Sequence, residues 1–206
     1  KKEKLPTGTC LILVTPDSER TMYTFLGTAG KISPNDIDLK ALKESELIFL
    51  EGYLWDEGDP KQAFDLCIKN SKKVAMSLSD KFCVDRHKPH FLELVKNRLD
   101  IIFANEDEIM SLIDAKNFDE VVQFGKSIKK VLVITRGEKG SICISKSSIQ
   151  EFGAQKNLKI VDLTGAGDLF AAGFLHGFMN RHNIEESLKK GTELSSKIIQ
   201  RIGARI

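Results

Sequence analysis

The sequence predicts an α/β protein in which helices cover both faces of a mostly parallel β-sheet. Short, continuous apolar runs alternate along the chain with stretches of amphipathic helical spacing. Such runs are typical of strands that are buried on both faces. Polar residues follow several of these runs, and parallel sheets bind their ligands at the carboxyl ends of their strands. We therefore expect a single ligand-binding edge.

The expected elements follow from local patterns. Turn residues at 16–18 separate two β-prone segments, 9–14 and 20–26, which predicts a hairpin. A serine and a proline at 33–34 predict the start of a helix. Beyond them we predict strands at 47–52, 74–79, 100–104, 131–135 and 159–161, helices at 60–70, 89–97, 106–113, 118–128, 169–178 and 184–198, and a second hairpin at 141–144 and 149–152.

Composition narrows the class of protein. The 206 residues carry 31 basic and 29 acidic side chains, which are interspersed, so no basic stripe indicates nucleic-acid binding. The apolar runs are too short to cross a membrane, and no apolar segment of a signal peptide follows the N-terminal lysines. The cysteines lack metal-ligand or redox spacing and indicate reduced thiols in a cytosolic protein: Cys10, Cys67, Cys83 and Cys143.

The most informative segment is Asp-Leu-Thr-Gly-Ala-Gly-Asp at 162–168. It follows an apolar run and opens a helix, so its outward N–H groups and the helix dipole predict an anion site. An acid beside that site makes sense if Asp168 takes a proton from a nucleophile that attacks a bound phosphoryl group. The alternative is an ordinary left-handed turn with Asp168 in the first helical turn. The small residues that would cradle the phosphate are Gly165, Ala166 and Gly167.

Three segments of the sequence, each after a predicted strand, resemble motifs of the ribokinase-like, or PfkB-type, kinases. Residues 162–174 resemble the C-terminal signature of that family. Residues 105–108 resemble its Asn-x-x-Glu motif, and residues 135–140 resemble its Thr-x-Gly-x-x-Gly loop. The resemblance covers essentially the whole chain. Within the family the adenosine kinases fit best, on segments 6–10, 77–82 and 198–203.

The resemblance implies a ribokinase-like three-layer αβα sandwich with a mostly parallel sheet and a β-hairpin lid. The lid would occupy residues 1–28 and the α/β nucleotide-binding part residues 29–206. The implied activity is ATP-dependent phosphorylation of a nucleoside or sugar hydroxyl, with adenosine converted to AMP as the leading expectation. The alternatives are a sugar kinase similar to ribokinase or fructokinase, and a non-catalytic nucleotide-binding fragment.

The resemblance also implies ligands, partners and extent. ATP and Mg²⁺ are the expected cofactors, with K⁺ as a further candidate. A small nucleoside or sugar is the expected partner, without nucleic acid or membrane, for a monomer or homodimer in the cytoplasm. Family domains carry roughly 100 more residues upstream, one small-domain length. We therefore expect this chain to be a fragment that keeps the ATP half of the site and lacks turnover by itself.

The resemblance assigns roles to individual residues. Asp168 would be the catalytic base. Asn105 and Glu108 would hold Mg²⁺ through water, although the same pair fits a helix capping box, and both can be true. Thr135, Gly137 and Gly140 would line the nucleotide, or they form a tight turn that joins a strand to the second hairpin. Ser77 and Ser79 could contact phosphate, or they are turn residues at the end of a strand.

The hairpin and the signature segment carry the remaining candidates. Arg20 could reach the transferring phosphoryl group, or it could be a solvated hairpin arginine. Asp162 resembles part of a monovalent-cation loop closed near residues 203–204; otherwise it bonds the turn amides. The residues expected to bind substrate, with ordinary packing as the alternative for the first four, are Cys10, Met22, Thr24, Phe82 and Thr164.

Overall fold

A computed structural model describes residues 4–55 and 61–206. The chain divides into two compact units, which are described separately. The first unit comprises the chain through Thr9 together with residues 25–134 and 144–147. The second comprises residues 10–24, 135–143 and 148–206.

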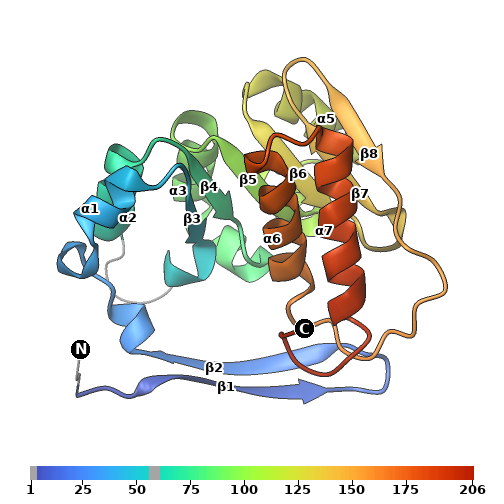
Figure 1. The fold of residues 1–206 in the computed structure, drawn as a ribbon, viewed down its shortest axis with the longest axis horizontal. Coiled ribbons are helices and arrows are strands. Elements are labelled where there is room, and N and C mark those ends of the chain that lie inside the picture. The colour runs from blue at the N-terminus through green and yellow to red at the C-terminus, as the bar shows by residue number, and fades with distance from the viewer. Residues whose placement is uncertain (1–3, 56–60) are drawn as a thin grey trace. The chain divides into compact units, whose positions relative to one another are not determined.

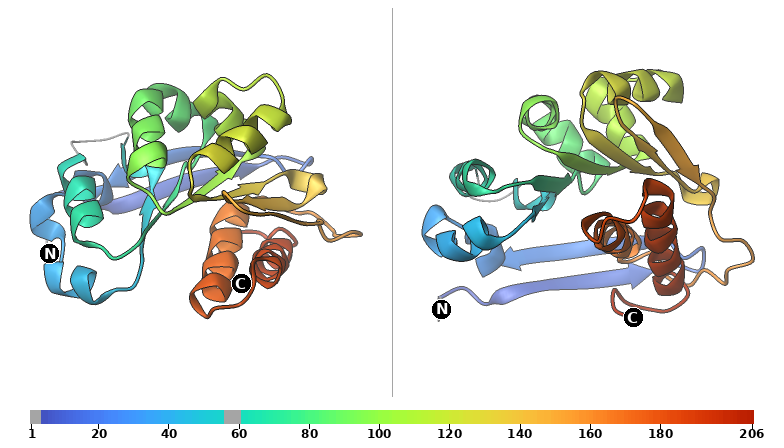
Figure 2. Two further views of the ribbon diagram at one scale, coloured as in Figure 1. Left: turned by 90° about the horizontal axis from the view of Figure 1, so that it is seen from above. Right: turned by 45° about the horizontal axis from the view of Figure 1, so that its top comes forward.

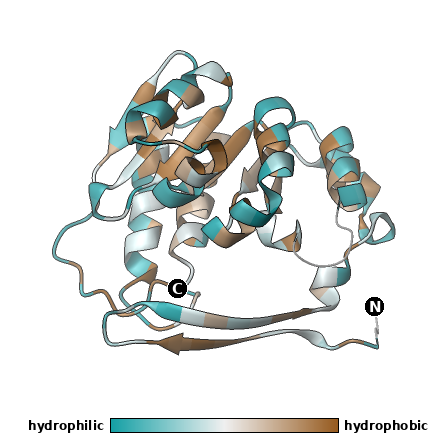
Figure 3. Ribbon diagram, turned by 180° about the vertical axis from the view of Figure 1, so that it is seen from behind, coloured by the Kyte–Doolittle hydropathy of each residue, from teal (hydrophilic) through white to brown (hydrophobic). Residues whose placement is uncertain are grey.

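The predicted N-terminal hairpin is present. Strands β1 (Thr7–Val14) and β2 (Arg20–Gly27) form a two-stranded sheet (Figure 1). The turn between them closes through a bond from the Thr15 N–H to the Glu19 carbonyl, at 2.9 Å. The end of β1 is strongly apolar (Figure 3), yet most of its side chains are exposed.

The predicted sheet is also present, with six strands in the order β3-β4-β5-β6-β7-β8. Strands β3, β4 and β5 are parallel, and Met76 of β4 lies opposite Leu50 on one side and Ile102 on the other. Met76 and Ile102 are fully buried, as expected for strands that are apolar on both faces. The strands are β3 (Ile48–Glu51), β4 (Val74–Ser77), β5 (Ile101–Asn105), β6 (Val131–Thr135), β7 (Ser141–Ile144) and β8 (Ile149–Phe152).

In the first unit, the connecting helices lie on one face of β3, β4 and β5 (Figure 2). Right-handed crossovers between parallel strands taken in sequential order place successive helices on the same face. Phe91 and Val95 of the third helix are fully buried in this unit. The helices are α1 (Leu39–Glu44), α2 (Lys61–Asn70), α3 (Lys81–Asn97), α4 (Glu106–Ile113) and α5 (Phe118–Ser127), and short 3-10 helices cover Thr28–Lys31, Pro34–Asp36 and Gly52–Trp55. A further 3-10 helix, Gly137–Lys139, belongs to the second unit.

Two helix starts differ from the prediction. The predicted start at 33–34 forms one 3-10 turn, and α1 begins separately, with Asp38 accepting bonds from the Lys40 and Ala41 N–H groups. Helix α3 begins at Lys81 rather than near Pro89, and it is kinked where His87 leaves helical geometry. Proline lacks an N–H group and disfavours helix just before it, so the sequence pattern places a start where the structure has a kink. For α2, predicted from position 60, that first position lies outside the described residues.

The second unit is built around two helices, α6 (Ala166–Met179) and α7 (Ile184–Ile198), which lie side by side (Figure 1). A Cβ atom on Gly173 would lie 2.5 Å from the Lys190 carbonyl oxygen, so the absence of a side chain there permits this close approach. Helix α7 also packs against β8. No helix within residues 4–55 and 61–206 has the length and apolar character needed to span a bilayer.

The strand predicted at 159–161 does not form. These residues belong to no strand of the sheet, and Ile160 is 46% exposed. The N–H groups of Val161 and Asp162 both donate to the carbonyl of Ile199, at 2.8 and 3.3 Å. The end of α7 therefore supplies the acceptor that a neighbouring strand was expected to supply.

Candidate active site

The signature segment forms a turn that opens α6. Gly165 is the N-cap residue in left-handed geometry (φ 79°, ψ 4°), and a Cβ there would lie 3.1 Å from the Cα of Ala204. The first helical bond runs from the Leu169 N–H to the Gly165 carbonyl, so the N–H groups of Gly167 and Asp168 precede it. An added Cβ on Gly167 would meet nothing within 4 Å. The backbone is therefore open to an anion at the positive end of the helix.

Asp168 lies in this first turn and is exposed. Across the described part of the chain, its carboxylate has no hydrogen-bond or ion-pair partner. The turn thus presents N–H donors and a free proton acceptor on the same helical turn, an arrangement that suits proton removal beside a bound phosphoryl group.

Hydrogen bonds to the Asp162 carboxylate join the turn to the segment that follows α7. Its Oδ1 accepts bonds from the N–H and the hydroxyl of Thr164, at 2.8 and 2.6 Å, and its Oδ2 accepts from the Gly203 N–H, at 2.9 Å. Burial would raise the pKa of Asp162, but the bonds from Thr164 and Gly203 and the charge of Arg20 hold that pKa below its usual range. The turn-bonding alternative is therefore realised. The cation role of Asp162 and the substrate role of Thr164 stay predictions.

The loop after β6 contains two glycines in left-handed geometry. Gly137 has φ 54° and Gly140 has φ 90°, and the Arg136 N–H donates to the Gly140 carbonyl at 2.8 Å. A Cβ on Gly140 would lie 2.1 Å from the Phe152 carbonyl oxygen, so this glycine is needed for packing. Gly137 has open space around it. Of the predicted nucleotide contacts here, which include Thr135 at the end of β6, Gly137 offers the most accessible backbone.

In the first unit, Asn105 and Glu108 form a complete capping box at the start of α4. The N–H and side-chain amide of Asn105 donate to the two carboxylate oxygens of Glu108, at 3.0 and 2.7 Å. The Glu108 N–H donates back to Asn105 Oδ1 at 2.8 Å. Burial raises the pKa of Glu108 to about 7; the Asn105 N–H opposes that rise, and the charges of Asp80 and Glu51 add to it. A cation bound here would favour the ionised carboxylate.

Ser77, Ser79 and Glu51 lie together at the ends of neighbouring strands. The Ser79 hydroxyl donates to Glu51 Oε2 at 3.0 Å, and the Ser79 N–H donates to the Ser77 hydroxyl oxygen at 3.2 Å. The sequence interpretation did not single out Glu51. An acid that ends a buried apolar strand was the signal that could have found it.

The predicted metal ligands are divided between the units, with Asn105 and Glu108 in the first and Asp162 in the second. Among the residues that the structure describes, no three His, Cys, Asp or Glu side chains are placed to hold a metal ion together. Metal binding by these residues therefore stays a prediction.

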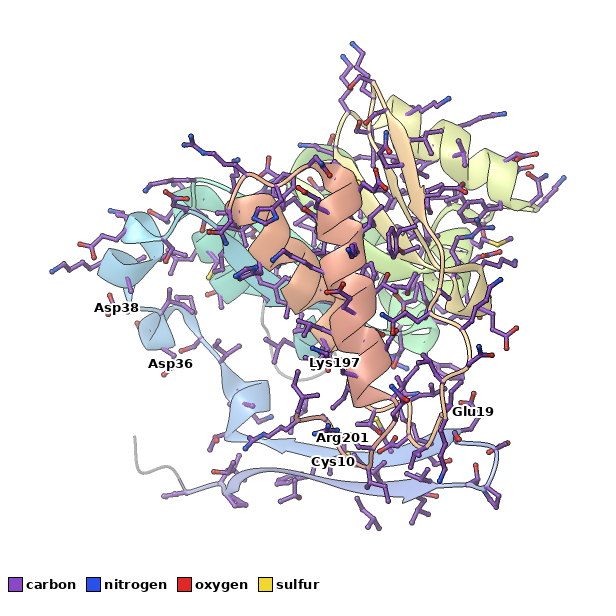
Figure 4. The ribbon with its side chains drawn as sticks, turned by 45° about the vertical axis from the view of Figure 1, so that its right-hand side comes forward. Cys10, Glu19, Asp36, Asp38, Lys197 and Arg201 are labelled. Atoms are coloured by element: carbon purple, nitrogen blue, oxygen red, sulfur yellow. The ribbon has the colours of Figure 1, made fainter. Side chains whose placement is uncertain are left out.

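The predicted substrate residues are likewise divided. Cys10 and Thr24 meet across the hairpin, with 3.2 Å between Sγ and Oγ1. Met22 and Arg20 follow at alternate positions of β2, on the same face as Thr24. Figure 4 shows Cys10 on the hairpin. Phe82 lies in α3 of the first unit and is 72% exposed.

The chain is similar over its whole length to one family of known proteins. Residues 1–206 match the model of the pfkB family carbohydrate kinases. The chain belongs to this family. Among curated relatives, it is 27% identical to an adenosine kinase of Saccharomyces cerevisiae over 217 residues, covering 96% of the chain and 62% of that enzyme. It is 26% identical to an uncharacterized sugar kinase of Archaeoglobus fulgidus, covering 97% of the chain and 79% of the relative.

Solved structures of related kinases support the same family assignment. The crystal structure of adenosine kinase from Sinorhizobium meliloti superposes with a TM-score of 0.94 at 36% identity, over 98% of this chain and 63% of that one. A probable sugar kinase from Rhizobium etli gives 0.94 at 35% identity, over 99% and 64%. The chain thus spans about two thirds of these proteins. The predicted ribokinase-like α/β fold with its mostly parallel sheet is confirmed.

Proposed function

We propose that this chain carries the nucleotide-binding and proton-transfer part of an ATP-dependent kinase that phosphorylates a nucleoside or sugar hydroxyl. The observation that supports this most is the first turn of α6, where open N–H groups and the free carboxylate of Asp168 lie together. A site that only bound an anion would gain nothing from a carboxylate beside it, because like charges repel. A site that removes a proton beside a phosphoryl group needs one.

In the proposed reaction, Asp168 accepts the proton of the acceptor hydroxyl as the bond to phosphorus forms. The N–H groups of Gly167 and Asp168 stabilise the charge on the transferring phosphoryl group. The hydrogen bonds that Asp162 accepts from Thr164 and Gly203 keep the turn in this shape. Asn105 and Glu108 would hold Mg²⁺, with the oxygen ligands that this ion prefers, and the ion would neutralise phosphate charge when bound.

Adenosine is the acceptor we propose, with AMP as the product, in the cytoplasm. Its support is the 36% identity to the Sinorhizobium meliloti adenosine kinase. All four cysteines are free thiols, which suits a reducing compartment. A sugar acceptor is the second candidate, favoured by the 35% identity to the Rhizobium etli probable sugar kinase.

Replacement of Asp168 tests the reaction. In the full-length protein, Asp168→Asn should lower kcat by on the order of 10² or more, the usual contribution of a general base, and should leave nucleotide affinity nearly unchanged. Asp119→Asn is the matched control, because Asp119 is also an exposed first-turn aspartate, in α5. Near-normal turnover of Asp168→Asn would exclude Asp168 as the base.

An ADP-release assay tests the acceptor. With adenosine, inosine, ribose and fructose offered in turn, we expect the highest kcat/KM for adenosine. If a free sugar has the highest value, the hairpin residues Cys10, Met22 and Thr24 do not form an adenine site, and the sugar-kinase alternative replaces the proposal.

A further inference from the structure

The turn of the hairpin contains a residue that its local geometry does not favour. Ser18 has φ 68°, in the left-handed region where glycine or asparagine is favoured. The Ser18 N–H donates to the Thr15 carbonyl at 2.8 Å, a bond that glycine would form equally well. An unfavourable backbone geometry that persists is a reason to look for a role of the side chain.

The side chain of Ser18 has a distant partner. Its hydroxyl donates to the backbone carbonyl of Ile160 at 3.0 Å, across 142 positions of sequence. The turn is held in shape from within, because the Asp17 carboxylate accepts bonds from the Thr15 hydroxyl and from the Glu19 N–H. The Ser18 hydroxyl is therefore presented on a fixed turn, and both partners belong to the second unit.

Ile160 begins the segment that leads into the turn at residues 162–168, the anion turn. This segment is outside the sheet, and its next two N–H groups are held by the carbonyl of Ile199. Asp162, in the same segment, accepts a hydrogen bond from the N–H of Thr164, one residue before Gly165. The hairpin tip and the anion turn are thus connected through residues 160–164.

We propose that Ser18 is a positioning residue, whose hydroxyl docks the hairpin tip on the Ile160 carbonyl and so holds Arg20 and the turn at 162–168 in one arrangement. The docking stands on the hydrogen bond and the turn geometry alone. The catalytic consequence rests on the proposed function. A single neutral hydrogen bond is small enough to let the tip leave and return during turnover.

The test compares substitutions that share backbone preference and differ in the donor. Asparagine and aspartate have nearly the same size and both tolerate left-handed geometry, but only the asparagine amide can donate. Ser18→Asn should therefore keep the docking bond, and Ser18→Asp should lose it. Ser18→Gly also removes the donor, without adding a charge and with no backbone penalty. It controls for the added charge of aspartate.

Two measurements on the full-length protein decide the outcome. In Ser18→Asp and Ser18→Gly, amide hydrogen exchange in segments 10–24 and 160–165 should rise about threefold to tenfold, the effect of one lost hydrogen bond. Their kcat should fall by a similar factor at unchanged KM for ATP. Ser18→Asn should match the wild type in both measurements.

Each departure has a distinct meaning. Exchange at the wild-type rate in both Ser18→Asp and Ser18→Gly would show that the hydroxyl does not dock the tip, and the proposal would be wrong whether or not the protein turns over. Faster exchange with unchanged kcat would overturn the positioning role. A wild type without kinase activity, combined with the predicted exchange pattern, would refute the proposed function and the catalytic consequence while supporting the docking.

Discussion

Glu108 shows how burial changes the chemistry of an ordinary capping residue. Glu108 belongs to the capping box of α4, and Glu186 belongs to an equivalent box at the start of α7, with Asn183 as its partner. Glu186 is exposed. Glu108 is only 5% exposed, and burial together with nearby acids raises its pKa to about 7. The same three-residue spacing therefore gives a structural cap in one helix and a group that titrates near neutral pH in another.

This difference predicts a pH dependence of stability. The folded-state pKa of Glu108 lies above the ordinary glutamate value of 4.5, so the protonated form is favoured by folding. Its contribution to the free energy of unfolding is complete below about pH 4.5 and is lost as the pH rises through about 7. The full effect is about 3 kcal/mol. Chemical denaturation between pH 5 and 8 should show a smaller fall in stability for Glu108→Gln than for the wild type.

Glu186→Gln is the control for the loss of a capping carboxylate, and it should follow the wild-type pH dependence. Because Mg²⁺ bound at Asn105 and Glu108 would favour the ionised form, added Mg²⁺ should reduce the dependence in the wild type and leave Glu108→Gln unaffected. Identical curves for Glu108→Gln and the wild type without Mg²⁺ would contradict the raised pKa.

At the scale of elements, helix α6 has glycines that serve opposite needs. Gly173 lies where α6 meets α7, and an added Cβ would lie 2.8 Å from the Cα of Gly191. Gly167 lies in the first turn, where an added Cβ would meet nothing. The first glycine permits helix packing, and the second keeps the helix end open to a ligand.

Alanine substitutions should separate these needs. Gly173→Ala should destabilise the protein by about 1–2 kcal/mol, because the cost of overpacking exceeds the gain in helix propensity. Gly167→Ala should raise stability by about 0.5 kcal/mol but lower kcat/KM, because the new methyl group occupies the approach to the anion site. Thermal unfolding and steady-state kinetics measure the two effects. A destabilised Gly167→Ala variant would show that this position is not open in solution.

At the scale of the whole molecule, the hairpin leaves large apolar side chains exposed. Leu11 and Tyr23, on neighbouring strands, are 62% and 61% exposed, and Phe25 is 46% exposed. A two-stranded hairpin has little stability of its own. The chain also spans only 63% of the Sinorhizobium meliloti adenosine kinase.

We therefore expect residues 1–206, expressed alone, to bind nucleotide without phosphorylating adenosine. The anion turn, the Gly137 loop and the Asn105 capping box are all formed within the chain, whereas the exposed apolar hairpin has no cover among the described residues. Calorimetric titration with ATP and the ADP-release assay, run beside the full-length protein, measure the two properties. Turnover by the 206-residue chain would contradict this expectation.

Much of this molecule was predictable from sequence, because local patterns decide it. The alternation of apolar runs and helical spacing predicted β3 to β8 and most helices within a few residues. The Asn105–Glu108 spacing predicted a capping box, and the glycines of 162–168 predicted an open helix start. Each of these depends on residues within one turn or one strand of each other, so the amino-acid order alone determines them.

Other features were decided by contacts between residues far apart in the chain. The segment 159–161 is apolar enough for a strand, but the end of α7 occupies its N–H groups. Asp162 accepts a hydrogen bond from Gly203, 41 positions away, and Ser18 donates one to Ile160, 142 positions away. The pKa of Glu108 depends on burial that its own helix does not provide. A local pattern carries no information about such partners, so only the tertiary structure settles which groups are held and which stay free to react.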